Sequence, residues 1–133
     1  MIAVLLGVFL ALVFVSWQHR YTASTSCRLL VYALGIAALI YILFAAAALE
    51  IEWLAIELLG FTVFLTIAWL GLKRSYWYLA TGWATHVLWD IGLHSNNTPA
   101  FVPSWYPAFC MSFDMIVAVY IVLFRARFAA LTR

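Results

Sequence analysis

The chain has 133 residues, of which 68% are apolar and only 9% are charged. Ordinary soluble domains contain about 25% charged residues, so this composition leaves too little polar side-chain surface to cover a soluble globule. A formal net charge of +2, with basic residues scattered along the chain, gives no reason to expect a nucleic-acid partner. The lipid bilayer is the partner that the composition predicts.

The first two predicted helices lie in the N-terminal part of the chain. The segment 2–17 is almost entirely apolar but shorter than the roughly 20 residues that a bilayer core of about 30 Å requires. We therefore expect an oblique helix, or one that extends past Trp17. A polar link, Tyr21–Ser26, separates it from an unbroken apolar run rich in alanine and leucine, which predicts a second helix over 29–49.

The next two predicted helices carry most of the internal charge. The third, 53–72, follows an acidic turn formed by Glu50 and Glu52, and it contains one internal acid, Glu57. A basic turn separates it from the fourth predicted helix, 76–94, which contains two histidines and an aspartate. Such residues are rare inside a membrane span because burying them in hydrocarbon costs free energy.

The fifth predicted helix follows a loop that contains Pro99 and Pro103, which break helices. Pro107 suits the first position of a helix, so we expect this helix over 107–124, with a basic tail after it. The fifth helix contains one acid, Asp114.

Together these elements predict an all-α fold, a polytopic transmembrane helical bundle that forms one domain, 1–133. All seven Lys and Arg residues fall in the first and third connections and in the tail, whereas the other two connections receive Glu50, Glu52 and no basic residue. Basic connections stay on the cytoplasmic side, which predicts an N-terminus outside and a C-terminus inside. The five expected spans are 2–17, 29–49, 53–72, 76–94 and 107–124.

The polar residues of the predicted spans have a regular spacing. His86, Asp90 and His94 are four residues apart, and such residues advance by about 40° per step on an α-helix, so we expect all three on one face. Depths counted from the helix ends place Glu57 level with Asp90, and Asp114 level with His86. The sequence therefore predicts one site in the outer half of the bilayer, formed by three helices.

Imidazole and carboxylate groups form a suitable ligand set for Zn, Fe or Mn. We therefore predict a divalent metal site held by His86, Asp90, His94 and Asp114, with Glu57 as a further ligand or as general base. The expected function is a membrane-embedded, metal-dependent enzyme whose site opens outward to an apolar or lipid-like substrate. Its chemistry would be hydrolytic or oxidative, as in di-metal carboxylate bundles.

Other interpretations of the same residues stay open. They include a hydrogen-bonded interhelical network, an ion or proton carrier, and a non-catalytic accessory or cofactor-binding subunit of a larger membrane complex or homo-oligomer. Gly82, four residues before His86, would also leave room for haem or chlorophyll on that histidine. Cys110 shares a face with Asp114 and could be a further ligand, but we prefer its interpretation as a buried apolar cysteine.

Between Trp83 and Arg127 the sequence contains Trp-Ala-x-His-x2-Trp-Asp-x3-His and then Pro-x-Trp-Tyr-Pro-x-Phe-Cys-x3-Asp. This combination, over roughly a third of the chain, resembles an uncharacterised family of small bacterial multi-pass membrane proteins. The resemblance implies a bacterial cytoplasmic membrane location and supplies no reaction. It also implies a shared core formed by Trp83, His86, Asp90, His94, Trp105, Tyr106, Pro107, Cys110 and Asp114, together with Glu57.

Overall fold

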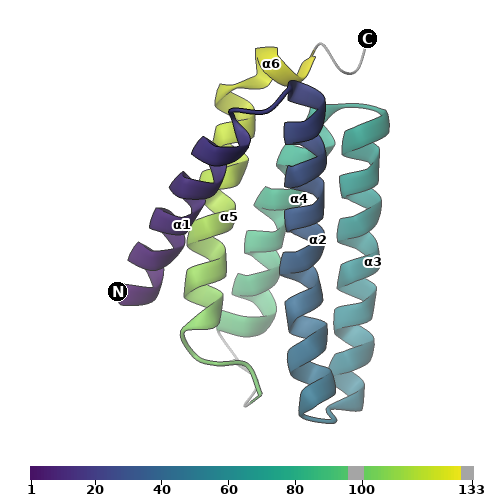
Figure 1. Ribbon diagram of the computed structural model, residues 1–133. Helices are drawn as coiled ribbons and strands as arrows, with labels where there is room; N and C mark the ends of the chain where they lie inside the picture. Colours follow the sequence, from purple (N-terminus) through teal and green to yellow (C-terminus); the bar gives the residue numbers. More distant parts are fainter. Residues whose placement is uncertain (96–100, 130–133) are drawn as a thin grey trace.

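The computed structural model describes residues 1–95 and 101–129, and the regular structure in these residues is helical throughout (Figure 1). The all-α prediction is therefore confirmed. A π-helical segment, η1, continues the fourth helix. The elements are α1 (Ile2–Gln18), α2 (Ala23–Ala47), α3 (Ile51–Lys73), α4 (Tyr76–Trp89), η1 (Asp90–Ser95), α5 (Tyr106–Leu123) and α6 (Arg125–Ala129).

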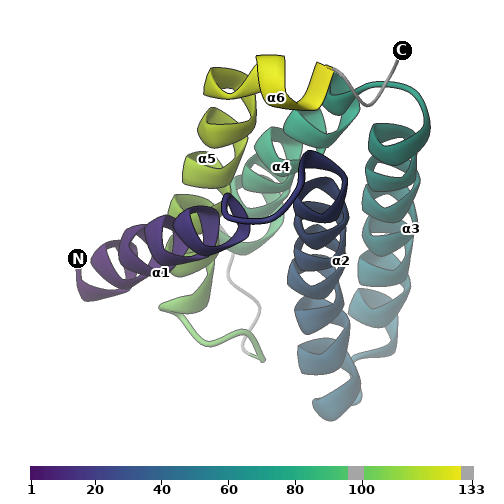
Figure 2. The ribbon, with the colours of Figure 1, turned by 45° about the horizontal axis from the view of Figure 1, so that its top comes forward.

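Four helices, α2 to α5, form an up-and-down bundle in which each helix packs against the next one in the chain. Helix α1 packs mainly against α5 and diverges from α2 towards its N-terminus (Figures 1 and 2). Gly7 permits this packing, because a Cβ atom there would lie 2.4 Å from the Phe109 carbonyl oxygen. The short α6 crosses the end of the bundle, where Arg127 donates to the His19 carbonyl at 2.7 Å.

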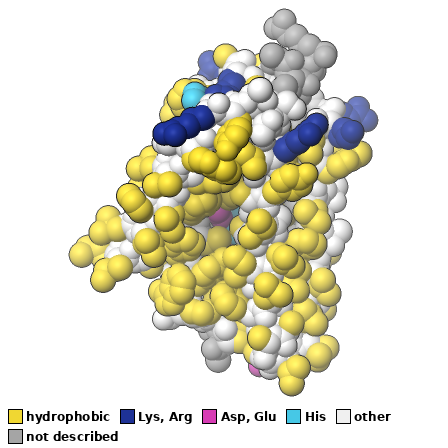
Figure 3. Space-filling view, in the orientation of Figure 1, with side chains coloured by type: hydrophobic (Ala, Val, Ile, Leu, Met, Phe, Trp, Pro, Cys, Tyr) yellow, Lys and Arg dark blue, Asp and Glu magenta, His cyan; other side chains and the backbone are white. Residues whose placement is uncertain are grey.

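Within the described residues, three helices are long and apolar enough to cross a membrane: α2, α3 and α5. At a rise of about 1.5 Å per residue, even the shortest of them is about 27 Å long. Helix α1 has 17 residues, and α4 with η1 forms a helical run of 14 and 6 residues. Large apolar side chains cover the outside of the bundle (Figure 3), including Leu43 and Trp69, each more than half exposed. Such a surface is suited to lipid.

The second helix begins earlier than the sequence predicts. The Thr22 side chain accepts a hydrogen bond from the Thr25 backbone N–H at 3.3 Å, which caps the N-terminus of α2. The helix therefore starts at Ala23, and most of the expected polar link, Tyr21–Ser26, is helical. The serine and threonine residues of this stretch form the cap and the first turn of α2. Composition alone does not show whether such residues begin a helix or form a loop.

Charge is separated along the bundle. The visible Lys and Arg side chains gather at the end that carries α6 (Figure 3), where α1 connects to α2 and α3 connects to α4. The described members of this basic end are Arg20, Arg28, Lys73, Arg74, Arg125 and Arg127, and Arg133 lies outside the described residues. Glu50 and Glu52 lie at the opposite end, in and just after the α2–α3 turn.

The α2–α3 turn closes through a Schellman motif. The backbone N–H of Glu50 donates to the Ala45 carbonyl at 3.0 Å, and that of Leu49 donates to Ala46 at 3.1 Å. The motif requires a left-handed residue after the helix, a position that usually holds glycine. Here it holds Leu49, with φ of 58° and an exposed side chain. A leucine in this conformation costs about 1–2 kcal/mol.

Replacing this residue, Leu49→Gly, is expected to stabilise the fold by about 0.5–1 kcal/mol, because relief of the left-handed strain exceeds the extra backbone entropy that glycine loses. Thermal unfolding in mild detergent measures the effect. The control is Leu59→Gly, an exposed leucine inside α3, which should destabilise by about 1 kcal/mol. A lower unfolding temperature for Leu49→Gly than for wild type would contradict the strain argument.

Candidate functional site

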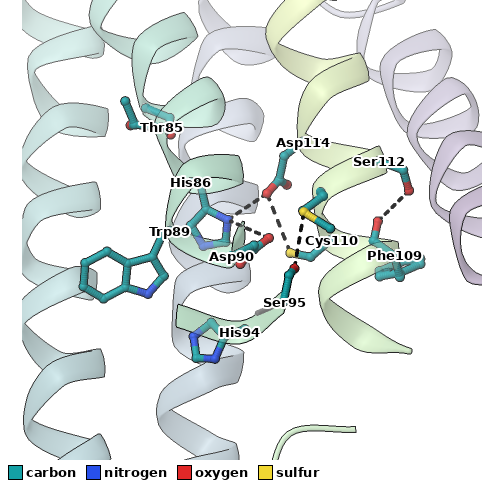
Figure 4. Close-up of polar contacts among 12 residues, drawn as sticks. Thr85, His86, Trp89, Asp90, His94, Ser95, Phe109, Cys110, Ser112 and Asp114 are labelled. Atoms are coloured by element: carbon teal, nitrogen blue, oxygen red, sulfur yellow. Dashed lines mark hydrogen bonds and ion pairs between the residues drawn. The ribbon is translucent and has the colours of Figure 1, made fainter. Parts of the chain in front are cut away.

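Two adjacent helices supply a buried group of metal-ligating side chains. His86 lies in the last turn of α4 and Asp90 begins η1, while Cys110 and Asp114 lie one turn apart on α5. Because α4 and α5 pack side by side, these side chains meet between them (Figure 4). Each is at most 3% exposed. We call these four residues the His86 cluster.

A single imidazole nitrogen lies between two carboxyl groups in the His86 cluster. His86 Nδ1 donates a hydrogen bond to Asp114 Oδ2 at 2.7 Å and lies 3.9 Å from Asp90 Oδ2. The Cys110 thiol donates weakly to the same Asp114 oxygen, with a sulfur–oxygen distance of 3.7 Å. One ligand atom from each residue lies within 4.8 Å of all the others. This spacing allows all four to contact one metal ion.

The π-helical segment changes the position of His94. In η1 the backbone hydrogen bonds run over five residues rather than four, so four residues complete less than one turn. His94 therefore leaves the face that His86 and Asp90 share and reaches α3, where its Nε2 lies 3.0 Å from Glu57 Oε1. The structure thus places His94 with Glu57, whereas the sequence analysis places it on the His86 face. Helical periodicity cannot reveal this widened turn.

His94 and Glu57 form a second buried group, which we call the Glu57 pair. Glu57 is 2% exposed, and its other oxygen accepts a hydrogen bond from the Trp89 indole at 3.3 Å. The Tyr41 ring stacks on His94, with centroids 4.0 Å apart and planes within 8°, and also lies 6.3 Å from the His86 ring. Tyr41 of α2 thus connects the two groups.

Several polar atoms of this region are buried without a hydrogen-bond partner among the described residues. They include both carboxyl oxygens of Asp90, Asp114 Oδ1, Glu57 Oε1, His86 Nε2 and the Tyr41 hydroxyl, although the last of these lies close to the Asp90 carboxyl group. Buried polar atoms are rarely left unpaired, since each costs about 1–3 kcal/mol. The described Lys and Arg residues lie at the basic end and form no ion pair with these carboxyl groups. These atoms are therefore the ones that a bound cation, a proton or a water could engage.

The structure brings together most of the residues that the sequence selects. His86, Asp90 and Asp114 meet in one cluster, and Glu57 and His94 form the adjacent pair. Cys110 belongs to the cluster, although the sequence analysis interprets it as an apolar residue; its spacing of four residues before Asp114 was the available signal. Tyr41 has no sequence signal, because a lone tyrosine in an apolar span is indistinguishable from a packing residue.

The tetrapyrrole interpretation finds no space beside Gly82. A Cβ atom on this glycine would lie 2.9 Å from Leu34 and 3.1 Å from Ile67, so side chains of α2 and α3 already fill the position. The His86 ring is also covered by Phe64, at a centroid distance of 4.8 Å. A flat macrocycle would have to displace these side chains.

The fold and the site define a class of protein: a helical bundle with helices long and apolar enough to cross a membrane, and a buried His/Asp/Cys group able to hold a metal ion. Within this class, the chain belongs to DUF6010, a family of unknown function whose model matches residues 1–127. The expectation of an uncharacterised family is confirmed. No curated protein and no solved structure matches the chain.

Gly60 provides the space in which Trp89 reaches Glu57. A Cβ atom on Gly60 would lie 2.5 Å from the Trp89 ring. Gly60→Ala is therefore expected to displace the indole from Glu57 and to destabilise the protein by about 1–3 kcal/mol, measured by thermal unfolding in detergent. The matched control is Gly92→Ala, where nothing lies within 4 Å of the added Cβ, and its stability should not fall. Equal effects at both glycines would contradict the packing argument.

Proposed function

We propose that this protein is a membrane-embedded, metal-dependent enzyme that acts on an apolar or lipid-like substrate. One observation carries the proposal: two fully buried carboxyl groups, Asp90 and Asp114, share one imidazole nitrogen of His86. Ionised carboxylates are costly in an apolar interior unless they are paired or bind a metal. A divalent cation would neutralise both acids and occupy the atoms that lack partners.

The ligand types favour zinc or iron over manganese. His86, Asp90, Cys110 and Asp114 supply one nitrogen, two oxygens and one sulfur, a number suited to a four-coordinate site. Thiolate is a soft ligand that zinc and iron bind well, whereas manganese prefers carboxylate, carbonyl and water. In this proposal Cys110 takes the ligand position that the sequence analysis assigns to His94.

The Glu57 pair would supply acid–base chemistry beside the metal. A metal bound in the His86 cluster would polarise a substrate or lower the pKa of a bound water, for hydrolytic or oxidative chemistry. Glu57, oriented by His94 and by the Trp89 indole, would act as the general base and accept the proton. The stacked Tyr41 ring would hold His94 in place. Chemistry of this kind requires a base that is positioned beside the reacting atoms.

We further propose five spans, with the N-terminus outside and the C-terminus inside a bacterial cytoplasmic membrane. Three helices meet the length criterion by themselves, and the helical run of α4 and η1 reaches the roughly 20 residues of a span. Helix α1 would cross obliquely beside α5. The gathering of basic residues at one end supports the orientation, because such residues remain on the cytoplasmic side.

Cysteines introduced at opposite ends test the orientation. Both native cysteines are buried, so a membrane-impermeant maleimide applied to intact cells should label Glu52→Cys and leave Arg74→Cys unlabelled. After the membrane is permeabilised, both should react. Labelling of Arg74→Cys in intact cells, without labelling of Glu52→Cys, would reverse the proposed orientation.

Metal analysis tests the proposed site. Protein purified in mild detergent and incubated with Zn²⁺ or Fe²⁺ should retain about one ion per chain after desalting, because the four ligands of one cluster hold a single ion. His86→Ala and Asp114→Asn should each lose it, since each variant removes a ligand.

The matched control is Glu52→Gln, which removes an exposed acid outside the cluster and should retain the metal. Helical circular dichroism and gel filtration show whether each variant is folded. Folded wild-type protein that retains no metal would overturn the proposal, and would indicate that protons balance the buried carboxylates.

A further inference from the structure

We propose that the substrate of this site is a molecule with a linear hydrocarbon chain, and that the chain reaches the His86 cluster sideways from the bilayer, between α2 and α5. The inference rests on the proposed function, because it names the substrate class and the entry route of that site. It stands on a cavity that ends at the cluster, on the depth of this cavity in the bundle, and on the chemistry of its walls.

The cavity lies between α2 and α5 and has a volume of about 240 Å³. Ala33 and Ala37 line it from α2, and Phe109 and Phe113 line it from α5. Cys110 and Asp114, two members of the His86 cluster, also lie in its wall. The surface is hollowed at mid-height of the bundle, and an acidic side chain is visible within the hollow (Figure 3).

The position of the cavity favours entry from lipid rather than from water. Asp114 is near the middle of α5, and Ala33 and Ala37 are near the middle of α2, so the mouth lies far from both ends of these helices. Both helices are apolar enough to cross a membrane, which places the mouth at the level of the acyl chains. Helix α1 diverges from α2 in this region (Figures 1 and 2) and leaves the mouth uncovered.

The walls and the size of the cavity suit a hydrocarbon chain. A cavity of about 150 Å³ with apolar walls is sufficient to bind benzene, and this one is larger. Its walls are mostly alanine, isoleucine and phenylalanine side chains, and Asp114, whose Oδ1 is buried and unpaired, also lines it. The chain of the substrate would occupy the apolar part, and its polar group would reach this carboxyl oxygen.

A second cavity on another side of α2 serves as an internal comparison. It has a volume of about 640 Å³ and is lined by Gly35, Leu39, Leu65 and Trp69 among others, with no acidic, basic or thiol side chain. Lipid chains should contact this surface as they contact any apolar face of the bundle. The proposal therefore concerns the cavity that reaches the cluster, rather than a general affinity for lipid.

Photolabelling with a fatty acid that carries an aliphatic diazirine close to its carboxyl end tests the route, because this end would lie beside Asp114. On irradiation the diazirine loses N₂, and the resulting carbene inserts into a nearby O–H, S–H or C–H bond. Full-length protein in a lipid nanodisc, stripped of metal by chelation, should give adducts on Cys110 or Asp114, mapped by peptide mass spectrometry. These residues are 3% and 0% exposed, so a probe that stays on the lipid-facing surface would not reach them.

Ala37→Trp should fill the mouth and abolish the adducts on Cys110 and Asp114, while adducts beside Trp69 persist. The matched control is Leu39→Trp, on the same helix but lining the second cavity, which should leave the Cys110 and Asp114 adducts intact. Ala33→Phe, which fills the same cavity from one turn away, replaces Ala37→Trp if that variant does not fold.

Wild-type protein that is labelled only on its lipid-facing surfaces would overturn the route, and so would adducts on Asp114 that Ala37→Trp and Ala33→Phe both leave unchanged. Because the labelling uses metal-free protein, its outcome is independent of metal binding. Adducts at Asp114 in a protein that never retains metal would support the route and sink the metal-dependent mechanism. Metal retention without these adducts would support the metal site and overturn the proposed route.

Discussion

The contact between His86 and Asp114, at 2.7 Å and fully buried, constrains most of this structure. An ionisable pair in an apolar bundle costs free energy unless the partners meet, so α4 and α5 must pack with these two positions at the same depth. That register places Asp90 and Cys110 beside the pair. The remaining helices then enclose the cluster: α3 contributes Phe64 against the His86 ring, and α2 contributes Tyr41.

The sequence predicts the helical class and much of the site because both follow from hydrophobicity and spacing. Residues four apart share a helical face, which correctly places Asp90 beside His86. Counting residues from the helix ends correctly places Asp114 at the depth of His86. The prediction fails for His94, because the π-helical turn from Asp90 to Ser95 depends on packing against neighbouring helices rather than on a local pattern. π-helical segments of this kind frequently occur at functional sites.

The separation of charge along the bundle explains why the cluster has no basic side chain to balance it. The described Lys and Arg residues lie at one end, whereas Asp90 and Asp114 are buried at other levels of the helices. An arginine in the bundle could neutralise these acids, as in many buried ion pairs, but among the described residues the group that lies near both of them is the His86 imidazole. The same distribution that favours a defined orientation in the membrane therefore leaves the buried acids dependent on a bound cation or on protons.

A purely structural network would be expected to satisfy its own hydrogen bonds, because an unpaired buried group costs more than a paired one gains. The Glu57 pair meets this condition only in part, since one Glu57 oxygen accepts from the Trp89 indole, whereas the other lies 3.0 Å from His94 Nε2 without hydrogen-bond geometry. The His86 cluster does not, because neither Asp90 oxygen has a hydrogen-bond partner among the described residues. The Glu57 carboxyl group, held by the Trp89 indole, therefore lies beside a cluster that retains several unpaired oxygens, an arrangement compatible with a positioned base next to a ligand site. A ligand site also gives a reason for Asp90, which packing alone would not require to be acidic and which lies one turn from His86 in the same cluster as Asp114.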